Sequence, residues 1–193
     1  EALRALTILG VVRSKPGGGM FVSSLNPEKL LGPLQFFLTL EGCSVDDLYQ
    51  TRMLIEGGIA RHAAAHAGPD ALARLRTIVA EQPKAVDDPT SYRRLDVEFP
   101  GMIRDLAGNA FMARIAASLN VLGMEFRTIA SETPAVIRRS LRDHAAVIDA
   151  FAARDPDAAD AAMQAHMRHV LESTRNAGVG APQKQSPRRK ARE

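Results

Sequence analysis

Four charged or titratable side chains fall on the apolar faces of segments with helical periodicity. Arg52, Asp96, His144 and His166 each have apolar residues three, four or seven positions away, which is the spacing of one helix face. Burying a carboxylate is unfavourable unless it is paired or bound to a metal. Helical bundles build metal sites from histidines on facing helices, but a single inward histidine is usually a hydrogen-bonded core residue. Both a metal centre and a polar core fit the pattern.

Arg52 has two roles open to it. Glu56 follows it by four positions, so the two side chains can form an ion pair within one helix. Alternatively, the planar guanidinium can grip the carboxylate of a small ligand through two parallel hydrogen bonds.

Pro100 follows Asp96 by four positions on the same predicted helix. Proline has no N–H for the Asp96 carbonyl, and its ring crowds that carbonyl, at a cost of roughly 3 kcal/mol in a helix interior. We expect the helix to bend between Asp96 and Pro100, with little resistance from Gly101.

Helix-start signals recur along most of the chain. An N-cap residue precedes proline at Asn26-Pro27, Asp88-Pro89, Thr133-Pro134 and Asp155-Pro156, while Ser44 starts another helix that Gly68-Pro69 ends. The predicted helices cover residues 27–40 (broken at Gly32-Pro33), 45–67, 70–82, 89–106, 110–130, 134–153 and 156–175. Because sustained period-two alternation is missing after residue 26, this part is predicted to be all-helical.

The first 25 residues have a different pattern. A helix with leucines at helical spacing stops at Gly10. Two short strands, Val11–Arg13 and Met20–Val22, then flank a Pro-Gly-Gly-Gly turn. A helix followed at once by a glycine-tipped hairpin is typical of the end of a winged helix-turn-helix.

Composition excludes several classes of protein. The 193 residues are 46% hydrophobic, carry a net charge of +3 and include one cysteine, Cys43. We find neither a signal-peptide pattern nor an apolar run of the roughly 18 residues that a membrane helix needs. These features predict a cytoplasmic protein without a disulfide framework and without membrane contact. A basic tail over 177–193 is predicted to be disordered.

Several stretches together resemble one family. "EALRALTILGVVRSKPGGGMFV" looks like the recognition-helix end and wing of the GntR family of bacterial transcription regulators. "DLYQTRMLIEGGIARHAAAHA", "LDVEFPGMIRDLAGNAF" and "DHAAVIDAFAARDPDAADAAMQAHM" are similar to the FadR-type ligand-binding domain, called FCD. The implied fold is mainly α: the remnant of a winged helix-turn-helix over 1–25, an antiparallel all-helical bundle over 26–176 that binds effector and dimerises, and the tail.

The resemblance implies a metal in the bundle that helps to bind a small carboxylate effector. Carried over by position, its ligands are Asp96, His144 and His166, with Pro100 at the usual place of a further histidine. A divalent ion is expected, zinc or nickel first, with an affinity weakened by Pro100. His169 is expected near the ligands or at the surface, and Arg52 is the candidate effector clamp.

The resemblance also implies contacts with operator DNA. Arg4 and Lys15 are candidates for phosphate contacts, while Gly17, Gly18 and Gly19 would let the wing backbone approach DNA closely or merely form a tight turn. The chain holds only the end of the family's winged domain, so an N-terminally truncated regulator is expected.

Three functions are therefore compared. The preferred one is a homodimeric, effector-responsive transcription regulator that is not an enzyme. The second is a helical metalloenzyme that uses two histidines and one carboxylate, although a general base at matched spacing is missing. The third is a degenerate ligand-binding module.

Overall fold

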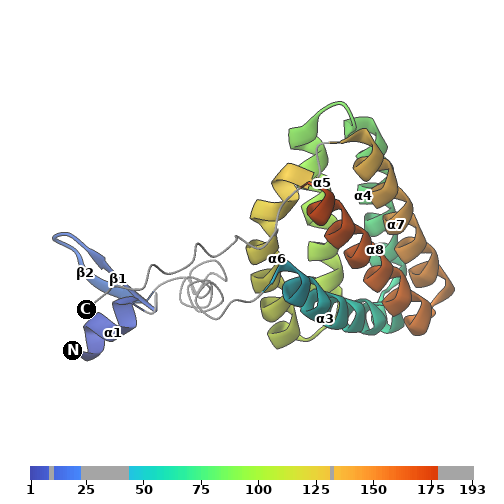
Figure 1. Ribbon diagram of the computed structural model, residues 1–193. Coiled ribbons are helices and arrows are strands. Elements are labelled where there is room, and N and C mark those ends of the chain that lie inside the picture. The colour runs from blue at the N-terminus through green and yellow to red at the C-terminus, as the bar shows by residue number, and fades with distance from the viewer. Residues whose placement is uncertain (9–10, 23–43, 131–132, 178–193) are drawn as a thin grey trace, which may run out of the picture.

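A computed structural model of the chain describes residues 1–8, 11–22, 44–130 and 133–177 (Figure 1). The helix predicted over 27–40 and the basic tail from residue 178 onward lie outside the described residues. The domain boundary expected between residues 25 and 26 also lies there, and it stays a prediction.

The amino-terminal part consists of one short helix and a hairpin. Helix α1 (Ala2–Ile8) precedes antiparallel strands β1 (Val12–Lys15) and β2 (Gly19–Val22), coloured blue in Figure 1. On the turn side both strands are longer than predicted, by two residues in β1 and one in β2, and β1 begins at Val12 and not at Val11. Gly18 N–H donates to the Lys15 carbonyl at 2.9 Å, and this closes a turn tight enough to keep Lys15 paired with Gly19. Gly17 and Gly19 have φ of +73° and +86°, a conformation that favours glycine.

The remaining described elements are helical. They are α3 (Val45–His66), α4 (Pro69–Glu81), the 3₁₀ helix η1 (Gln82–Ala85), α5 (Pro89–Leu106), α6 (Ala110–Ala130), α7 (Pro134–Ala153) and α8 (Pro156–Asn176). Figure 1 shows them gathered in one bundle. None of the described helices is long and apolar enough to cross a membrane.

Helix starts follow the sequence signals closely. Side chains of Asp88, Thr133 and Asp155 accept hydrogen bonds from backbone N–H groups of the first turn, and Ser44 forms a capping box with Asp47. The prediction at Gly68 was wrong in detail, since α3 already ends at His66. Gly68 is instead the N-cap of α4, because Pro69 occupies the first position of that helix.

Helices α3 and α8 pack antiparallel and very closely. Near one end Tyr49 lies 3.5 Å from Thr174 between the hydroxyl oxygens, and near the other Arg61 of α3 pairs with Asp160 of α8. A Cβ atom added to Gly57 would overlap the side chains of α8, so glycine lets the two backbones approach. This close contact closes the bundle between its first and last described helices.

The apolar core fills the space between these helices and α4, α5 and α7. Its fully buried members include Ile59, Leu75, Phe99, Val147 and Met163, each from a different helix. Helices α7 and α8 also run antiparallel, as their cross-helix ion pairs show, and they lie side by side in Figure 1. The polar residues described next are therefore enclosed by apolar packing.

Pro100 is buried within α5, and the helix continues through it to Leu106. The proline thus leaves the Asp96 carbonyl without its i+4 donor inside a continuous helix. The bend expected between Asp96 and Pro100 stays a prediction.

We predict that Pro100→Ala raises the free energy of unfolding by about 1 kcal/mol. The gain comes from the restored hydrogen bond, reduced by lost ring packing and by the larger entropy of the unfolded chain. Urea unfolding followed by circular dichroism measures it. Pro134→Ala is the matched control, since proline at the first position of α7 costs no helical hydrogen bond. A loss of stability in Pro100→Ala would contradict the prediction.

Candidate functional site

The structure brings Asp96, His144 and His166 together from α5, α7 and α8. Asp96 is 4% exposed, His144 0% and His166 1%. Nε2 of His144 lies 3.8 Å from Oδ1 of Asp96, and the two imidazole centroids are 4.6 Å apart. Predicted from three separate segments, these residues thus form one buried polar group, which we call the Asp-His-His cluster.

Gln82 holds the first imidazole of this cluster from the side. Its Oε1 lies 2.9 Å from Nδ1 of His144, and its Nε2 donates to the Leu95 carbonyl at 3.3 Å. The side chain of Gln82 is fully buried on η1. The ring of Phe99 packs against the same imidazole with centroids 4.3 Å apart, so His144 is fixed by packing as well as by the amide.

Asp143 performs a similar task for the second imidazole. Its Oδ2 lies 3.5 Å from Nδ1 of His166 and 2.9 Å from Nδ1 of His169. Burial raises the pKa of Asp143, but hydrogen bonding and charge interactions with the two histidines outweigh it and bring the pKa below its ordinary value. A carboxylate that stays ionised therefore faces both rings. His169 lies beside the cluster, which agrees with the expectation that it is near the candidate ligands.

These residues fit a divalent metal in the kind of donor they offer. Two imidazoles and one carboxylate are ligands for zinc or nickel. Among the described residues, neither ring nitrogen of buried His166 has a hydrogen-bond partner, although Nδ1 lies near Asp143, so this imidazole can still bind a ligand or metal. The three side chains are nevertheless not arranged around one common position. Within the described chain, no group of three or more His, Cys, Asp or Glu side chains is close enough together to hold a metal ion.

Arg52 lies in a second buried polar group, formed by α3 and α6. Its Nη2 lies 2.8 Å from Oε1 of Glu56, and the same Nη2 donates to Oδ1 of Asn120 at 3.3 Å. The predicted pair with Glu56 is thus confirmed, in a setting where Arg52 is 0% exposed. The Tyr49 ring lies beneath the guanidinium, 5.1 Å from its central carbon.

The guanidinium of Arg52 retains binding capacity. Nη1 is buried and has no hydrogen-bond partner among the described residues. A Cβ atom on Gly123 would lie 2.8 Å from this nitrogen, so glycine lets the guanidinium lie close to the α6 backbone. An acceptor oxygen within hydrogen-bond distance of Nη1 would satisfy a buried N–H that otherwise costs stability.

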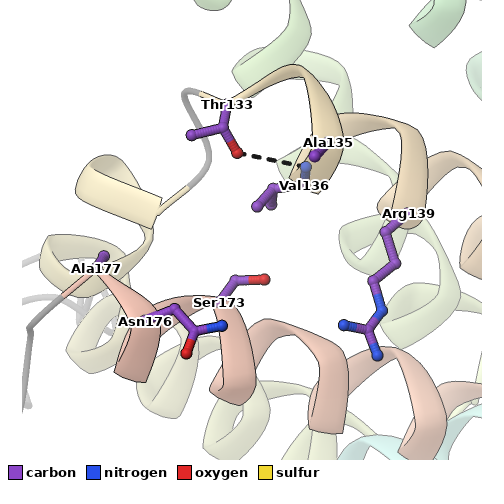
Figure 2. Close-up of a pocket in the computed structure, with 7 residues that line it drawn as sticks. All are labelled: Thr133, Ala135, Val136, Arg139, Ser173, Asn176 and Ala177. Atoms are coloured by element: carbon purple, nitrogen blue, oxygen red, sulfur yellow. Dashed lines mark hydrogen bonds between the residues drawn. The ribbon is translucent and has the colours of Figure 1, made fainter.

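A groove of about 480 Å³ lies between the start of α7 and the end of α8 (Figure 2). Its lining residues are Thr133, Ala135, Val136, Arg139, Ser173, Asn176 and Ala177. Several of its polar groups are already engaged: Arg139 pairs with Glu172 at 2.8 Å, and Thr133 caps α7. The Asp-His-His cluster and Arg52 do not line the groove, so it is not the predicted effector site.

The candidate DNA-binding residues lie in the amino-terminal part. Arg4 on α1 and Lys15 at the end of β1 are exposed, as phosphate contacts require. Gly17 and Gly19 are explained by the turn, whereas a Cβ on Gly18 would approach only the Lys15 side chain. Their contact with DNA stays a prediction.

Comparisons with known proteins agree with this architecture. The FCD domain family matches residues 47–169. The HTH-type transcriptional repressor NanR of Salmonella newport is 32% identical over 183 residues, covering 88% of this chain and 67% of the relative. NanR of Salmonella typhimurium is also 32% identical, covering 88% of this chain and 66% of that repressor. The chain thus spans about two thirds of the length of these curated relatives.

Solved structures show the same fold. GntR of Streptococcus agalactiae superposes with a TM-score of 0.60 at 28% identity, covering 89% of this chain and 78% of that one. McbR/YncC of E. coli superposes with a TM-score of 0.62 at 16% identity, covering 91% of this chain and 77% of that one.

An FCD-type helical bundle that follows a winged hairpin defines a transcription regulator with an effector-binding domain. The chain belongs to the GntR family of such regulators. Its relatives are transcriptional repressors, which places it with regulators and not with the helical metalloenzymes considered above. The FadR-type subdivision and the use of a metal stay predictions.

The sequence did not point to Gln82, Asp143 or Asn120. Gln82 directly precedes Pro83 at a helix end, where a polar residue is ordinary. Asp143 adjoins His144, and this neighbour relation was the one available signal. Their importance depends on which helix packs against them, and periodicity along one helix does not contain that information.

We predict that Glu56→Leu lowers the free energy of unfolding by about 3–5 kcal/mol, because it leaves the buried Arg52 charge uncompensated. The double variant Arg52→Met/Glu56→Leu should regain most of this loss, since no charge then remains in the pair. Urea unfolding of Glu56→Leu, of Arg52→Met and of the double variant gives the coupling energy. A loss in the double variant equal to the sum of the two single losses would show that the ion pair contributes nothing.

Proposed function

We propose that this regulator senses a small organic acid through a divalent metal in its helical bundle and thereby changes how winged domains bind operator DNA. The Asp-His-His cluster carries the proposal, because three polar groups from separate helices are buried against one another. The residues that would hold the metal are Asp96, His144 and His166. A bound metal would supply positively charged open positions for a carboxylate.

The contacts of the two imidazoles support the metal role. Histidines that ligate metals usually offer one ring nitrogen to the metal and donate from the other to an oxygen. Here Nδ1 of His144 faces Gln82, and Nδ1 of His166 faces Asp143. On the other side of the His144 ring, Nε2 lies 3.8 Å from Oδ1 of Asp96, and the two imidazole centroids are 4.6 Å apart. The three candidate ligands thus lie next to one another, as a shared cation would require.

Arg52 supports recognition of an acid. Its Nη1 is buried and has no hydrogen-bond partner among the described residues, so it needs an acceptor. A carboxylate oxygen would form a charge-assisted hydrogen bond there. An effector shifts the equilibrium between two conformations of a regulator only if it binds one of them more tightly. The acid must therefore bind one arrangement of the helical bundle with higher affinity than the other.

We also propose that the regulator acts as a cytoplasmic homodimer. Large apolar side chains are exposed on two adjoining helices: Leu54 of α3 is 73% exposed, while Phe111 and Ile115 of α6 are 75% and 38% exposed. Apolar side chains gathered on neighbouring elements often mark an interface. A second copy of the chain is the partner expected of an operator-binding regulator.

Metal titration tests the sensor. Zn²⁺ or Ni²⁺ added to chelator-stripped protein should bind the wild type with measurable heat, and His144→Ala or His166→Ala should weaken binding by at least about tenfold. Pro100→His should strengthen it, because it restores the ligand position that the family pattern implies. Isothermal titration calorimetry measures these affinities.

Two controls make this result decisive. His62 and His66 form an exposed pair four residues apart on α3, so the titrations use a His62→Ala/His66→Ala background to exclude binding there. Pro100→Ala separates backbone repair from the added ligand. Unchanged affinity in His144→Ala, His166→Ala and Asp96→Ala would mean that the cluster is a polar core. A screen of organic acids for thermal stabilisation, with and without metal, then identifies the effector class.

The dimer makes a separate prediction. Leu54→Glu/Phe111→Glu should shift the protein from dimer to monomer in sedimentation velocity, because it places charge on both apolar helix faces. The control is Arg76→Glu, which changes the charge of an exposed position on α4. A wild type that sediments as a monomer at all concentrations would contradict the proposal.

A further inference from the structure

Gln82 is the residue whose contacts decide the state of the central imidazole. A glutamine amide has one end that accepts hydrogen bonds and one that donates. The Leu95 carbonyl can only accept, so the amide nitrogen of Gln82 must face it, at 3.3 Å. Oε1 of Gln82 therefore faces Nδ1 of His144, at 2.9 Å. Because an amide oxygen only accepts, the proton of a neutral imidazole lies on Nδ1.

The position of this proton determines what the other side of the ring offers. A neutral imidazole protonated at Nδ1 carries a lone pair on Nε2. That atom lies 3.8 Å from Oδ1 of Asp96, on a ring whose centroid is 4.6 Å from that of His166. The lone pair is thus presented to the interior of the cluster, toward a carboxylate that would otherwise attract a proton.

Two arrangements of the same residues therefore compete. With the proton on Nδ1, His144 offers a lone pair beside a carboxylate, which suits a cation. With the proton on Nε2, His144 would donate to Asp96 and the cluster would become a hydrogen-bonded core. The carboxylate favours the second arrangement by charge, whereas the Gln82 oxygen favours the first.

We infer that Gln82 is a positioning residue that sets the tautomer of His144 and so keeps the cluster competent to bind a metal. The consequence for metal affinity rests on the proposed function, but the tautomer does not. Burial strengthens the argument, because Gln82 is 0% exposed and water does not compete for its amide. Asp143 presents a negatively charged acceptor to Nδ1 of His166 at 3.5 Å and so biases the second ring in the same sense.

The test uses the full chain, chelator-stripped and labelled with ¹⁵N-histidine. Long-range ¹H–¹⁵N spectra distinguish the two tautomers, and the spectrum of His144→Ala identifies the His144 signals. The wild type should show Nδ1 protonated and Nε2 bare. Gln82→Met, which has similar length but neither donor nor acceptor at its end, should move the proton to Nε2. Zinc affinity measured by calorimetry should fall about 10- to 100-fold, as for other residues that orient metal-ligating histidines.

Two further variants guard the result. Gln164→Met is the matched control, because that glutamine bonds Asp160 on its own helix and does not reach His144. Gln82→Asn, which withdraws the acceptor by one methylene, replaces Gln82→Met should the latter fail to fold by circular dichroism. It should show the same change of tautomer.

The outcomes separate the inference from the proposed function. A His144 ring that stays protonated at Nδ1 in the folded Gln82 variant, or that carries its proton on Nε2 in the wild type, overturns the inference. A wild type that shows the expected tautomer change with Gln82 but binds no zinc supports the inference and contradicts the metal function. Unchanged zinc affinity together with a changed tautomer overturns the link between the two.

Discussion

The cost of removing polar groups from water governs this bundle more than any other factor. Its interior holds a guanidinium, two carboxylates and two imidazoles among apolar helices. Each is held by a partner from another turn or another helix: Arg52 by Glu56 and Asn120, His144 by Gln82. Such groups are stable only while all their partners stay in register. The packing of the helices therefore has to be specific, and not only tight.

That specificity is what an effector-responsive domain requires. The Asp-His-His cluster joins α5, α7 and α8, while Gln82 adds the short helix η1 that lies between α4 and α5. A ligand that alters one of these polar contacts changes the balance of forces on several helices at once. Because a packed core does not deform continuously, such a change is expressed as a choice between discrete arrangements. A regulator with an effector-binding domain needs this behaviour.

Local chemistry explains which parts of the structure were predictable from the sequence. Asp88, Thr133 and Asp155 each act on their own first turn, so their caps were readable from adjacent letters. The inward faces of Asp96, His144 and His166 were also readable, because helical periodicity places them there. The partners were not. Gln82 and His144 are 62 positions apart, and only the packing of α4 beside α7 brings them together. The length of the hairpin turn and the role of Gly68 as an N-cap were not predictable either, because they depend on backbone hydrogen bonds that several residue types can make.

The antiparallel contact of α3 with α8 also affects how the protein is made. Asp46 at the start of α3 pairs with Arg175 at the end of α8, with Nη2 and Oδ2 2.7 Å apart and 129 positions between the two residues. During synthesis, α3 leaves the ribosome long before the helix that covers its buried face. In the nascent chain, the Ala- and Gly-rich helix α3 and its Arg52 therefore stay without the cover of α8 until that helix emerges. Completion of the bundle therefore waits for α8, and a chain that terminates within α8 yields a product for the cell's chaperones and proteases.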